Sequence, residues 1–347
     1  MKGFYTFTEK QHNELCSALS TVAAISPYVD YSSFKNTMKS SVQGRLIPEF
    51  FIEICERIRA DRDNGNQVHV LKNCPIDTDI PDLNHDDPVS DKYRLKKTFL
   101  GEAFLGTFAY LLNNPLLSYA SRNNGDFFTD VVSINRFRGK RTGFTDGDLI
   151  FHNDRTSHPV RADYVALLGV RCPANDLVYT TYVDGKDIIR NLLPEQVRIL
   201  SEKWYYTEVD DLTREKVKNW DKSSAHAILK DGTICFQDTL TKPVANAPIG
   251  ALEALLAFKD AITKSPKYRH RIENGDLLVF ANQYGLHNRE RIEVNNSEDT
   301  AKRWLLKTYS FKDPAVANTY VDYWVNGIYG CAGDEVVENR YELSSNK

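Results

Sequence analysis

The stretch that decides the fold is DLIFHNDRTSHPVRADYVALLGVRC, residues 148–172. It places His152 and His158 within seven residues, puts Asp154 two positions after the first histidine, and continues as a largely apolar run. Residues i and i+2 of a β-strand point to the same face, so the spacing predicts that His152 and Asp154 face the same way. The tripeptide alone is also typical of a hydrogen-bonded surface pair. His158, followed by Pro159, remains either a second candidate ligand or a structural residue beside the site.

A third metal ligand has to come from another part of the chain. The segment DLLVFANQYGLHNRERI, residues 276–292, offers His287 after an apolar strand and an Asn-Gln-Tyr-Gly turn. Two imidazoles and one carboxylate form the facial triad that holds non-haem Fe(II) and leaves coordination positions open for a co-substrate and O₂. Imidazole suits Fe(II), and the carboxylate offsets part of its charge. We therefore predict that His152, Asp154 and His287 are both the metal ligands and the catalytic residues.

Two further segments carry residues suited to bind a small dicarboxylate. Arg303 follows His287 by sixteen positions in AKRWLLKTYSF, and a bidentate guanidinium on such a strand could grip a carboxylate. Thr180 and Thr181 lie 28 and 29 residues after His152 in VYTTYV, where a hydroxyl could bond the same carboxylate. Threonine is also an ordinary strand former, and Arg303 could pair at the surface. The prediction therefore rests on the ordered set of residues and not on any one of them.

Composition excludes several classes of protein. The chain has 347 residues, 41% of them hydrophobic, which is ample for a large packed core. Its net charge of −3, from 44 basic and 47 acidic side chains, lacks the basic footprint of a nucleic-acid binder. We find no signal peptide and no run near the ~20 apolar residues of a membrane span. The six cysteines form no CxxC pair, which favours reduced thiols. We therefore expect a cytoplasmic protein with no nucleic-acid or membrane partner.

The pattern of apolar residues divides the chain into a helical first part and a strand-rich remainder. Residues 1–130 contain amphipathic helical segments, the first of which begins with a capping residue at Thr8, and one strand-like run lies between them. Over residues 130–312, short β-rich runs are separated by Gly, Asp, Asn and Pro, as in an antiparallel barrel or sandwich. A helical lid insert interrupts them at about residues 185–265, and residues 313–347 form a C-terminal extension. No repeat or linker divides the chain, which predicts a single domain over residues 1–347.

These motifs together resemble the clavaminate synthase-like group of Fe(II)/2-oxoglutarate-dependent dioxygenases. In that group a His-x-Glu/Asp pair precedes a His-Pro-like element, a turn and a Leu-rich strand ending in Arg and Pro, to which residues 149–173 are similar. Residues 275–292 resemble the segment of the distal histidine, and residues 303–311 the strand of the 2-oxoglutarate arginine. The resemblance covers residues 140–312, whereas residues 1–130 match only in helical character. It implies an α+β protein with a mainly β core, a double-stranded β-helix or jelly roll with flanking helices.

The resemblance also implies the cofactors and their ligands. Fe(II) would be held by the triad defined above, with 2-oxoglutarate and O₂ as co-substrates. Arg303 would pair with the distal carboxylate of 2-oxoglutarate, helped by Thr180 or Thr181. Most of the group has Glu as the carboxylate ligand, whereas the related taurine dioxygenases commonly have Asp, and a halogenase would have Gly or Ala there. Asp154 therefore argues for an enzyme that transfers oxygen.

Within this group the chain looks most like the hydroxylases of free arginine, asparagine and lysine. Lys307 occupies the place where the arginine hydroxylases carry an arginine for the substrate carboxylate, and it shares a strand face with Arg303. Those enzymes also carry lid acids, for which KDGTICFQDTLTK offers Asp231 and Asp238, with Asp184 as a further candidate. Acids there would meet a cationic side chain. We therefore predict hydroxylation of a free basic L-amino acid, L-lysine at C4 or C3, giving hydroxylysine, succinate and CO₂.

Other functions remain open from the sequence. A hydroxylase of L-arginine or of another small amino-acid-derived metabolite would use the same residues. A non-catalytic jelly-roll ligand-binding protein would keep the barrel without needing the triad. A zinc hydrolase with the same ligands would leave the arginine and threonine anchor without a purpose. The expected partner is a small molecule, and the sequence specifies neither the oligomeric state nor the carbon that is oxidised.

Overall fold

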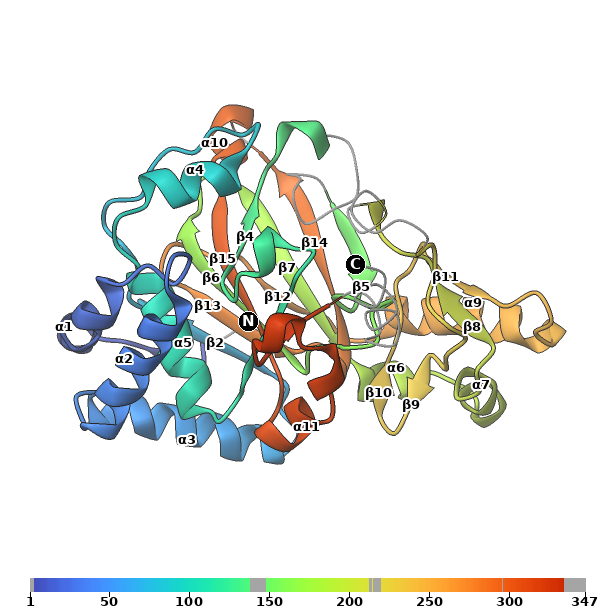
Figure 1. The fold of residues 1–347 in the computed structure, drawn as a ribbon. Helices are drawn as coiled ribbons and strands as arrows, with labels where there is room; N and C mark the ends of the chain where they lie inside the picture. Colours follow the sequence, from blue (N-terminus) through green and yellow to red (C-terminus); the bar gives the residue numbers. More distant parts are fainter. Residues whose placement is uncertain (1–2, 138–147, 212–213, 215–219, 295, 334–347) are drawn as a thin grey trace, which may run out of the picture.

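The computed structural model of the protein describes residues 3–137, 148–211, 214, 220–294 and 296–333. Two β-sheets lie at its centre (Figure 1). Residues of both sheets line one cavity. The larger sheet is mixed and has the strand order β1-β2-β13-β6-β15-β3-β16, with β4 also pairing with β15. Its strands are β1 (Tyr5–Thr6), β2 (Val68–Lys72), β3 (Leu116–Tyr119), β4 (Thr129–Val132), β6 (Tyr164–Arg171), β13 (Leu277–Ala281), β15 (Trp304–Ser310) and β16 (Cys331–Ala332).

The second sheet is antiparallel and has the strand order β12-β7-β14-β5. Its strands are β5 (Leu149–His152), β7 (Leu177–Asp184), β12 (Tyr268–His270) and β14 (Gly285–Glu293). Strand β14 pairs with β7 on one side and with β5 on the other, where His287 lies directly opposite His152. The pairing of two strands distant in sequence therefore brings two of the predicted ligands together.

Helices of the first third pack against the larger sheet. They are α1 (Glu9–Ala23), α2 (Tyr31–Gln43), α3 (Glu49–Asp63), α4 (Pro88–Leu95) and α5 (Leu100–Leu111). Thr8 caps α1 and forms a capping box with Gln11, which confirms the helix start predicted at Thr8. Phe104 of α5 stacks on Phe51 of α3 and joins the same apolar core as Leu306 of β15. This packing anchors the strand that carries Lys307.

The predicted insert forms its own apolar cluster on the opposite side of the sheets from α1 and α2 (Figure 1). Its elements are α6 (Gly185–Arg190), α7 (Pro194–Leu200), β8 (Tyr205–Thr207), β9 (Leu229–Lys230), β10 (Thr233–Ile234), β11 (Thr241–Pro243) and α9 (Ile249–Lys264). Phe236 packs edge-on against Phe258 of α9, and its backbone bonds Asn153 beside the metal-ligand segment. The insert is thereby attached directly to the site.

The prediction of an α+β protein is confirmed. Three of the β-rich runs predicted over residues 130–312 appear as β5, β6 and β7, and the apolar run before His287 is β13. The chain then forms α10 (Ser297–Ala301) before β15 and α11 (Pro314–Asn318) after it. None of the helices in the described part of the chain is long and apolar enough to cross a membrane.

Candidate metal and co-substrate site

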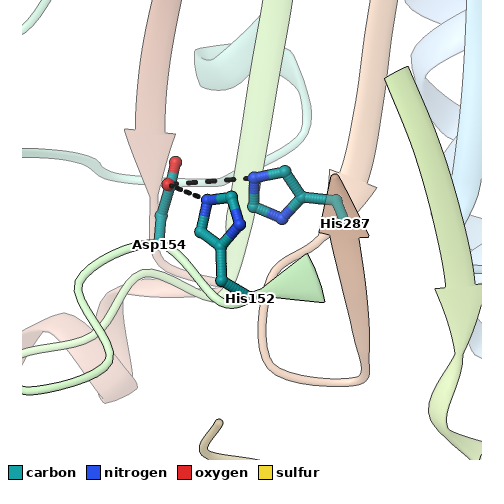
Figure 2. Close-up of side chains that lie close together, drawn as sticks. All are labelled: His152, Asp154 and His287. Atoms are coloured by element: carbon teal, nitrogen blue, oxygen red, sulfur yellow. Dashed lines mark ion pairs between the residues drawn. The ribbon is translucent and has the colours of Figure 1, made fainter. Parts of the chain in front are cut away.

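His152, Asp154 and His287 converge at one point between the sheets (Figure 2). One ligand atom from each residue lies within 4.8 Å of the other two. The nearer carboxylate oxygen of Asp154 is 3.4 Å from Nε2 of His152 and 3.8 Å from Nε2 of His287. Among the described residues this is the only group of three such side chains that could hold a metal ion. The geometry matches the two-imidazole, one-carboxylate set that suits non-haem Fe(II).

The route by which Asp154 reaches the triad differs from the sequence expectation. His152 is the last residue of β5, and Asp154 lies just beyond it in a turn, so the two are not two positions of one continuous strand. Arg155 has a left-handed backbone with φ of 59°, a conformation uncommon for a residue other than glycine. The turn, and not the pleat of a strand, therefore directs the carboxylate back toward the two imidazoles.

The protonation states of the triad suit metal binding. Burial lowers the pKa of His287 to about 3, with a further contribution from the neighbouring His152, so its imidazole is neutral at pH 7. Burial opposes ionisation of Asp154, but the Lys307 ammonium and the neighbouring imidazoles of His152 and His287 outweigh it and hold the pKa of Asp154 well below its usual range. His152 donates through Nδ1 to the Ile150 carbonyl at 2.7 Å, which turns Nε2 toward the carboxylate.

A cavity of about 450 Å³ opens onto the triad. Its walls come from both sheets and from the insert, and include Leu149 of β5, Leu305 of β15 and Leu240. Arg303, Leu305, Lys307 and Tyr309 all line it, as expected for alternate residues on one strand face. The predicted shared face of Arg303 and Lys307 is therefore present. A cavity of this size is within the range of small-molecule sites.

Arg303 also lines this cavity and directly precedes the first residue of β15. Within the described residues its guanidinium makes no side-chain hydrogen bond or ion pair. Burial lowers its pKa, and Cys172 and Asp176 are the nearest groups that oppose this effect. A partly buried, unsatisfied guanidinium beside a cavity is well suited to bind a carboxylate.

The two threonines point to opposite faces of β7. Thr180 lines the cavity, whereas Thr181 donates from its hydroxyl to Glu290 at 2.6 Å. Arg289 is paired with Thr180 across β14 and β7 and also lines the cavity. Arg289 was not among the residues predicted from the sequence, although its position two residues after His287 on the same strand face was a usable signal.

Lys307 faces the triad directly. Its ammonium lies 3.2 Å from the second carboxylate oxygen of Asp154 and 4.7 Å from the centre of the Tyr309 ring. Across β15 it is paired with Leu167 of β6 and Thr129 of β4, so its position is fixed by the larger sheet. Lys307 is thus ion-paired with one of the three candidate metal ligands.

The acids selected for the substrate side chain lie elsewhere. Asp231 is exposed in the tight turn between β9 and β10 with φ of 50°, and Asp238 pairs with Lys259 of α9 at 2.8 Å. Asp184 caps α6 through a hydrogen bond to the Lys186 amide. None of these three lines the cavity as far as the described residues define it.

Besides Asp154 of the triad and the buried Asp130 of β4, three acids line the cavity, and these three lie on the segment after β8. They are Glu208, Asp210 and Asp211. Each has a cationic neighbour: Lys242 lies 2.7 Å from Glu208, Arg122 lies 2.6 Å from Asp210 and Arg214 lies 3.5 Å from Asp211. The sequence argument did not select this EVDD segment, whose run of acids between two predicted elements was a visible signal.

His158 does not join the triad. It is buried, and its ring nitrogens contact backbone groups of Val160 and Gly333. Its ring also packs edge-on against Tyr119. These contacts agree with the prediction that His158 is a structural residue beside the site and not a metal ligand.

The comparisons with known proteins agree with this geometry. Residues 101–309 match the model of the taurine catabolism dioxygenase TauD, TfdA family, and the chain belongs to that family. The predicted class, an Fe(II)- and 2-oxoglutarate-dependent dioxygenase, is thereby confirmed, together with the predicted iron, 2-oxoglutarate and O₂. The non-catalytic and hydrolase alternatives fall away. No match was found among curated protein sequences.

Solved structures of similar fold are oxygenases. Asparagine oxygenase in complex with Fe(II), 2S,3S-3-hydroxyasparagine and succinate has a TM-score of 0.78 at 19% identity, over 95% of this chain and 99% of that one. The non-heme iron oxygenase OrfP with Fe and alpha-ketoglutaric acid has a TM-score of 0.77 at 17% identity, with the same coverage. OrfP with Fe, succinate and (3R,4R)-dihydroxy-L-Arg has a TM-score of 0.76 at 18% identity, also over 95% and 99%. At these identities the likeness establishes the fold.

Proposed function

We propose that this protein hydroxylates a free L-amino acid, with Fe(II) held by His152, Asp154 and His287 and with 2-oxoglutarate as co-substrate. The observation that carries the proposal is that the triad lines the same cavity as Arg303, whose guanidinium has no side-chain partner among the residues that the structure describes. The similar structures support the choice of an amino acid, because asparagine oxygenase and OrfP are solved with hydroxylated asparagine and arginine. When bound, ferrous iron and 2-oxoglutarate supply the activation of O₂ that replaces a C–H bond of the substrate by C–OH, with succinate and CO₂ as co-products.

Two of the side chains that line the cavity would orient the co-substrate. Arg303 would donate two parallel hydrogen bonds to the distal carboxylate of 2-oxoglutarate, and the Thr180 hydroxyl would donate a third. The hydrogen bond of Thr181 to Glu290 favours Thr180 as the threonine that takes part. Fixing the distal carboxylate in this way would point the keto-acid end toward the triad.

The metal ligands would themselves need little rearrangement. His287 is neutral and Asp154 is ionised in the metal-free protein, so neither ligand has to lose a proton before binding a cation near pH 7. Lys307 would move from the Asp154 carboxylate to the α-carboxylate of the substrate, which would place the substrate over the triad. Apolar side chains, such as Leu305 and Val165, would limit the access of water to the reacting carbon.

L-Lysine remains the sequence-derived prediction for the particular substrate. That prediction needs an acid beside the ε-ammonium of lysine, but the two acids selected for this role, Asp231 and Asp238, do not line the cavity. A cationic side chain would instead have to share Asp210 or Asp211 with the arginines already beside them. L-Arginine and uncharged amino acids are therefore tested alongside lysine.

We further infer that the two sheets are the halves of a double-stranded β-helix forming one domain over residues 1–347. Support comes from strands of three parts of the chain in one sheet. Strand β2 precedes residue 130, β6 lies in the central part, and β16 lies in the C-terminal extension. A core shared in this way does not divide into separately folding pieces.

The decisive experiment uses the full chain with Fe(II) and 2-oxoglutarate. Under anaerobic conditions the ternary complex should show a weak visible absorption band from the chelated keto acid. In air, succinate formation should then be measured with each of the common L-amino acids. Substrate-dependent succinate with at least one of them, together with a hydroxylated product, supports the proposal. Binding of Fe(II) and 2-oxoglutarate without stimulation by any amino acid would contradict the substrate class.

A further inference from the structure

Asn153 lies between His152 and Asp154 in the sequence, and it is only 1% exposed. Its amide nitrogen donates to the carbonyl oxygens of Asn282 and of Gly285, the latter at 2.8 Å. Its amide oxygen accepts from the Phe236 backbone at 2.9 Å. One side chain therefore ties the His152–Asp154 segment to the distal-histidine hairpin and to the insert.

Asn282 makes the reciprocal connection from the hairpin. It is fully buried at the start of the turn between β13 and β14, five residues before His287. Its amide oxygen accepts from the backbone N–H of Asp154 at 2.8 Å, and its amide nitrogen donates to the Asp154 carbonyl at 3.2 Å. The same nitrogen donates to the Ala162 carbonyl at 3.1 Å. The side chain thus pairs with Asp154 as a neighbouring β-strand would.

Only a carboxamide satisfies all of these contacts. The backbone around each asparagine presents one N–H and two carbonyl oxygens. The side chain at that position must therefore supply one acceptor and two donors. An aspartate would place a negative charge against two carbonyl oxygens. Alanine would leave the same backbone groups buried without partners. The position of Asp154, which lies in a turn and not in a strand, depends on these bonds.

We propose that Asn153 and Asn282 are positioning residues that form a reciprocal clamp and hold Asp154 at the distance from His287 that metal binding requires. The clamp acts through backbone, since neither asparagine is a metal ligand. The inference rests on the proposed function, because it assumes that the triad binds Fe(II). Groups that orient metal ligands typically change metal affinity by about 10- to 100-fold when they are removed.

The test measures the Fe(II) dissociation constant of the full chain by anaerobic calorimetry, before and after Asn153→Ala and Asn282→Ala. Asn114→Ala is the matched control. Asn114 is also buried, accepts from Arg62 at 2.8 Å and donates to the Lys312 carbonyl at 2.7 Å, far along the chain from the metal segments. Each variant is measured at a temperature at which circular dichroism shows it folded. Should an alanine variant not fold, the serine variant at the same position replaces it.

We expect Fe(II) binding to weaken at least tenfold in both clamp variants and to stay within twofold in Asn114→Ala. Saturating Fe(II) should restore part of the turnover, because the ligands themselves are intact. Clamp variants that bind Fe(II) within twofold of the wild type would overturn the clamp and leave the proposed function standing. An equal loss of Fe(II) affinity in all three variants would also overturn the clamp, because general destabilisation of the protein would then explain the loss. A wild-type chain that binds no Fe(II) would overturn the proposed function and the clamp with it.

Discussion

At the scale of single residues, His287 shows how burial prepares a ligand. It is 8% exposed, its Nδ1 has no hydrogen-bond partner among the described residues, and burial lowers its pKa to about 3. Loss of either imidazole leaves two ligands, which is too few for a stable facial site. We predict that His287→Ala and His152→Ala abolish Fe(II) binding and turnover while the protein stays folded. Calorimetry with Fe(II) measures this, with His12→Ala as the control. Full activity of either variant at stoichiometric iron would refute the assignment.

Arg303 is the residue on which co-substrate affinity should depend. A charge-assisted hydrogen-bond pair contributes about 1.5–3 kcal/mol, and about 1.4 kcal/mol corresponds to a tenfold change in affinity. We therefore predict that Arg303→Ala raises the apparent dissociation constant of 2-oxoglutarate at least tenfold, measured through the visible band of the anaerobic complex. Arg171 on the neighbouring strand β6 binds Asp82 and the Ile80 carbonyl instead. Arg171→Ala should leave 2-oxoglutarate binding unchanged, and an unchanged value for Arg303→Ala would place the anchor elsewhere.

His69 should make the protein sensitive to mild acid. Burial lowers its pKa from the usual value of 6.5 to about 4, although Asp61 at 2.8 Å opposes this shift. Between these two values the unfolded chain takes up a proton that the folded protein refuses, so stability falls as the pH falls. Because of His69, the free energy of unfolding should therefore be about 2 kcal/mol lower at pH 5 than at pH 7. Urea unfolding of the wild type and of His69→Gln measures the difference. Equal pH slopes for the two proteins would contradict the prediction.

At the scale of elements, strand β14 is held close against β7 where it begins. A Cβ added to Gly285 would lie 2.4 Å from the Tyr182 ring and 2.4 Å from the Val183 carbonyl. Overpacking of this kind costs about 1–3 kcal/mol, and here it would also shift His287, two residues further on. We predict that Gly285→Ala lowers both the free energy of unfolding and the affinity for Fe(II).

The matched control for this substitution is Gly250→Ala in α9. There the added Cβ would meet only the end of the Ile199 side chain, at 3.1 Å. Alanine favours a helix over glycine by about 1 kcal/mol, so the control should be neutral or stabilising. A Gly285→Ala protein with unchanged Fe(II) affinity would show that β14 can move without disturbing the site.

At the scale of the whole molecule, a buried ion pair connects the helical layer to the cavity wall. Lys92 of α4 is fully buried and lies 2.6 Å from Asp130 of β4, which also accepts from the Trp304 ring nitrogen at 2.9 Å. Removing one partner of a buried pair costs about 3–5 kcal/mol, because the other charge stays uncompensated. We predict a loss of this size for Lys92→Met in urea unfolding.

Adding Asp130→Asn to Lys92→Met should recover part of the lost stability, because the orphaned charge is then gone. Lys10→Met is the control, since Lys10 and Glu14 form an exposed pair 3.9 Å apart and such pairs contribute little. If Lys92→Met and Lys10→Met cost the same, the ion pair does not connect the two layers energetically.

The sequence by itself determined the class of protein and selected the three side chains that converge as candidate metal ligands. His152, Asp154 and His287 could be chosen because only a few residue types bind iron, and Arg303 with Lys307 because side chains alternate along a strand. The start of α1 at Thr8 followed from local capping chemistry in the same way. These features depend on residue identity and short-range spacing, which the sequence states directly.

The tertiary structure alone decided which polar residues meet across the fold. It placed Asp154 in a turn held by Asn282, 128 positions along the chain, and sent Thr180 to the cavity but Thr181 to Glu290. It also moved Asp231 and Asp238 away from the cavity and brought the acids after β8 to it. Such contacts depend on the register between strands and on where an insert packs, and both are set by the burial of many side chains together. No short stretch of sequence carries that information.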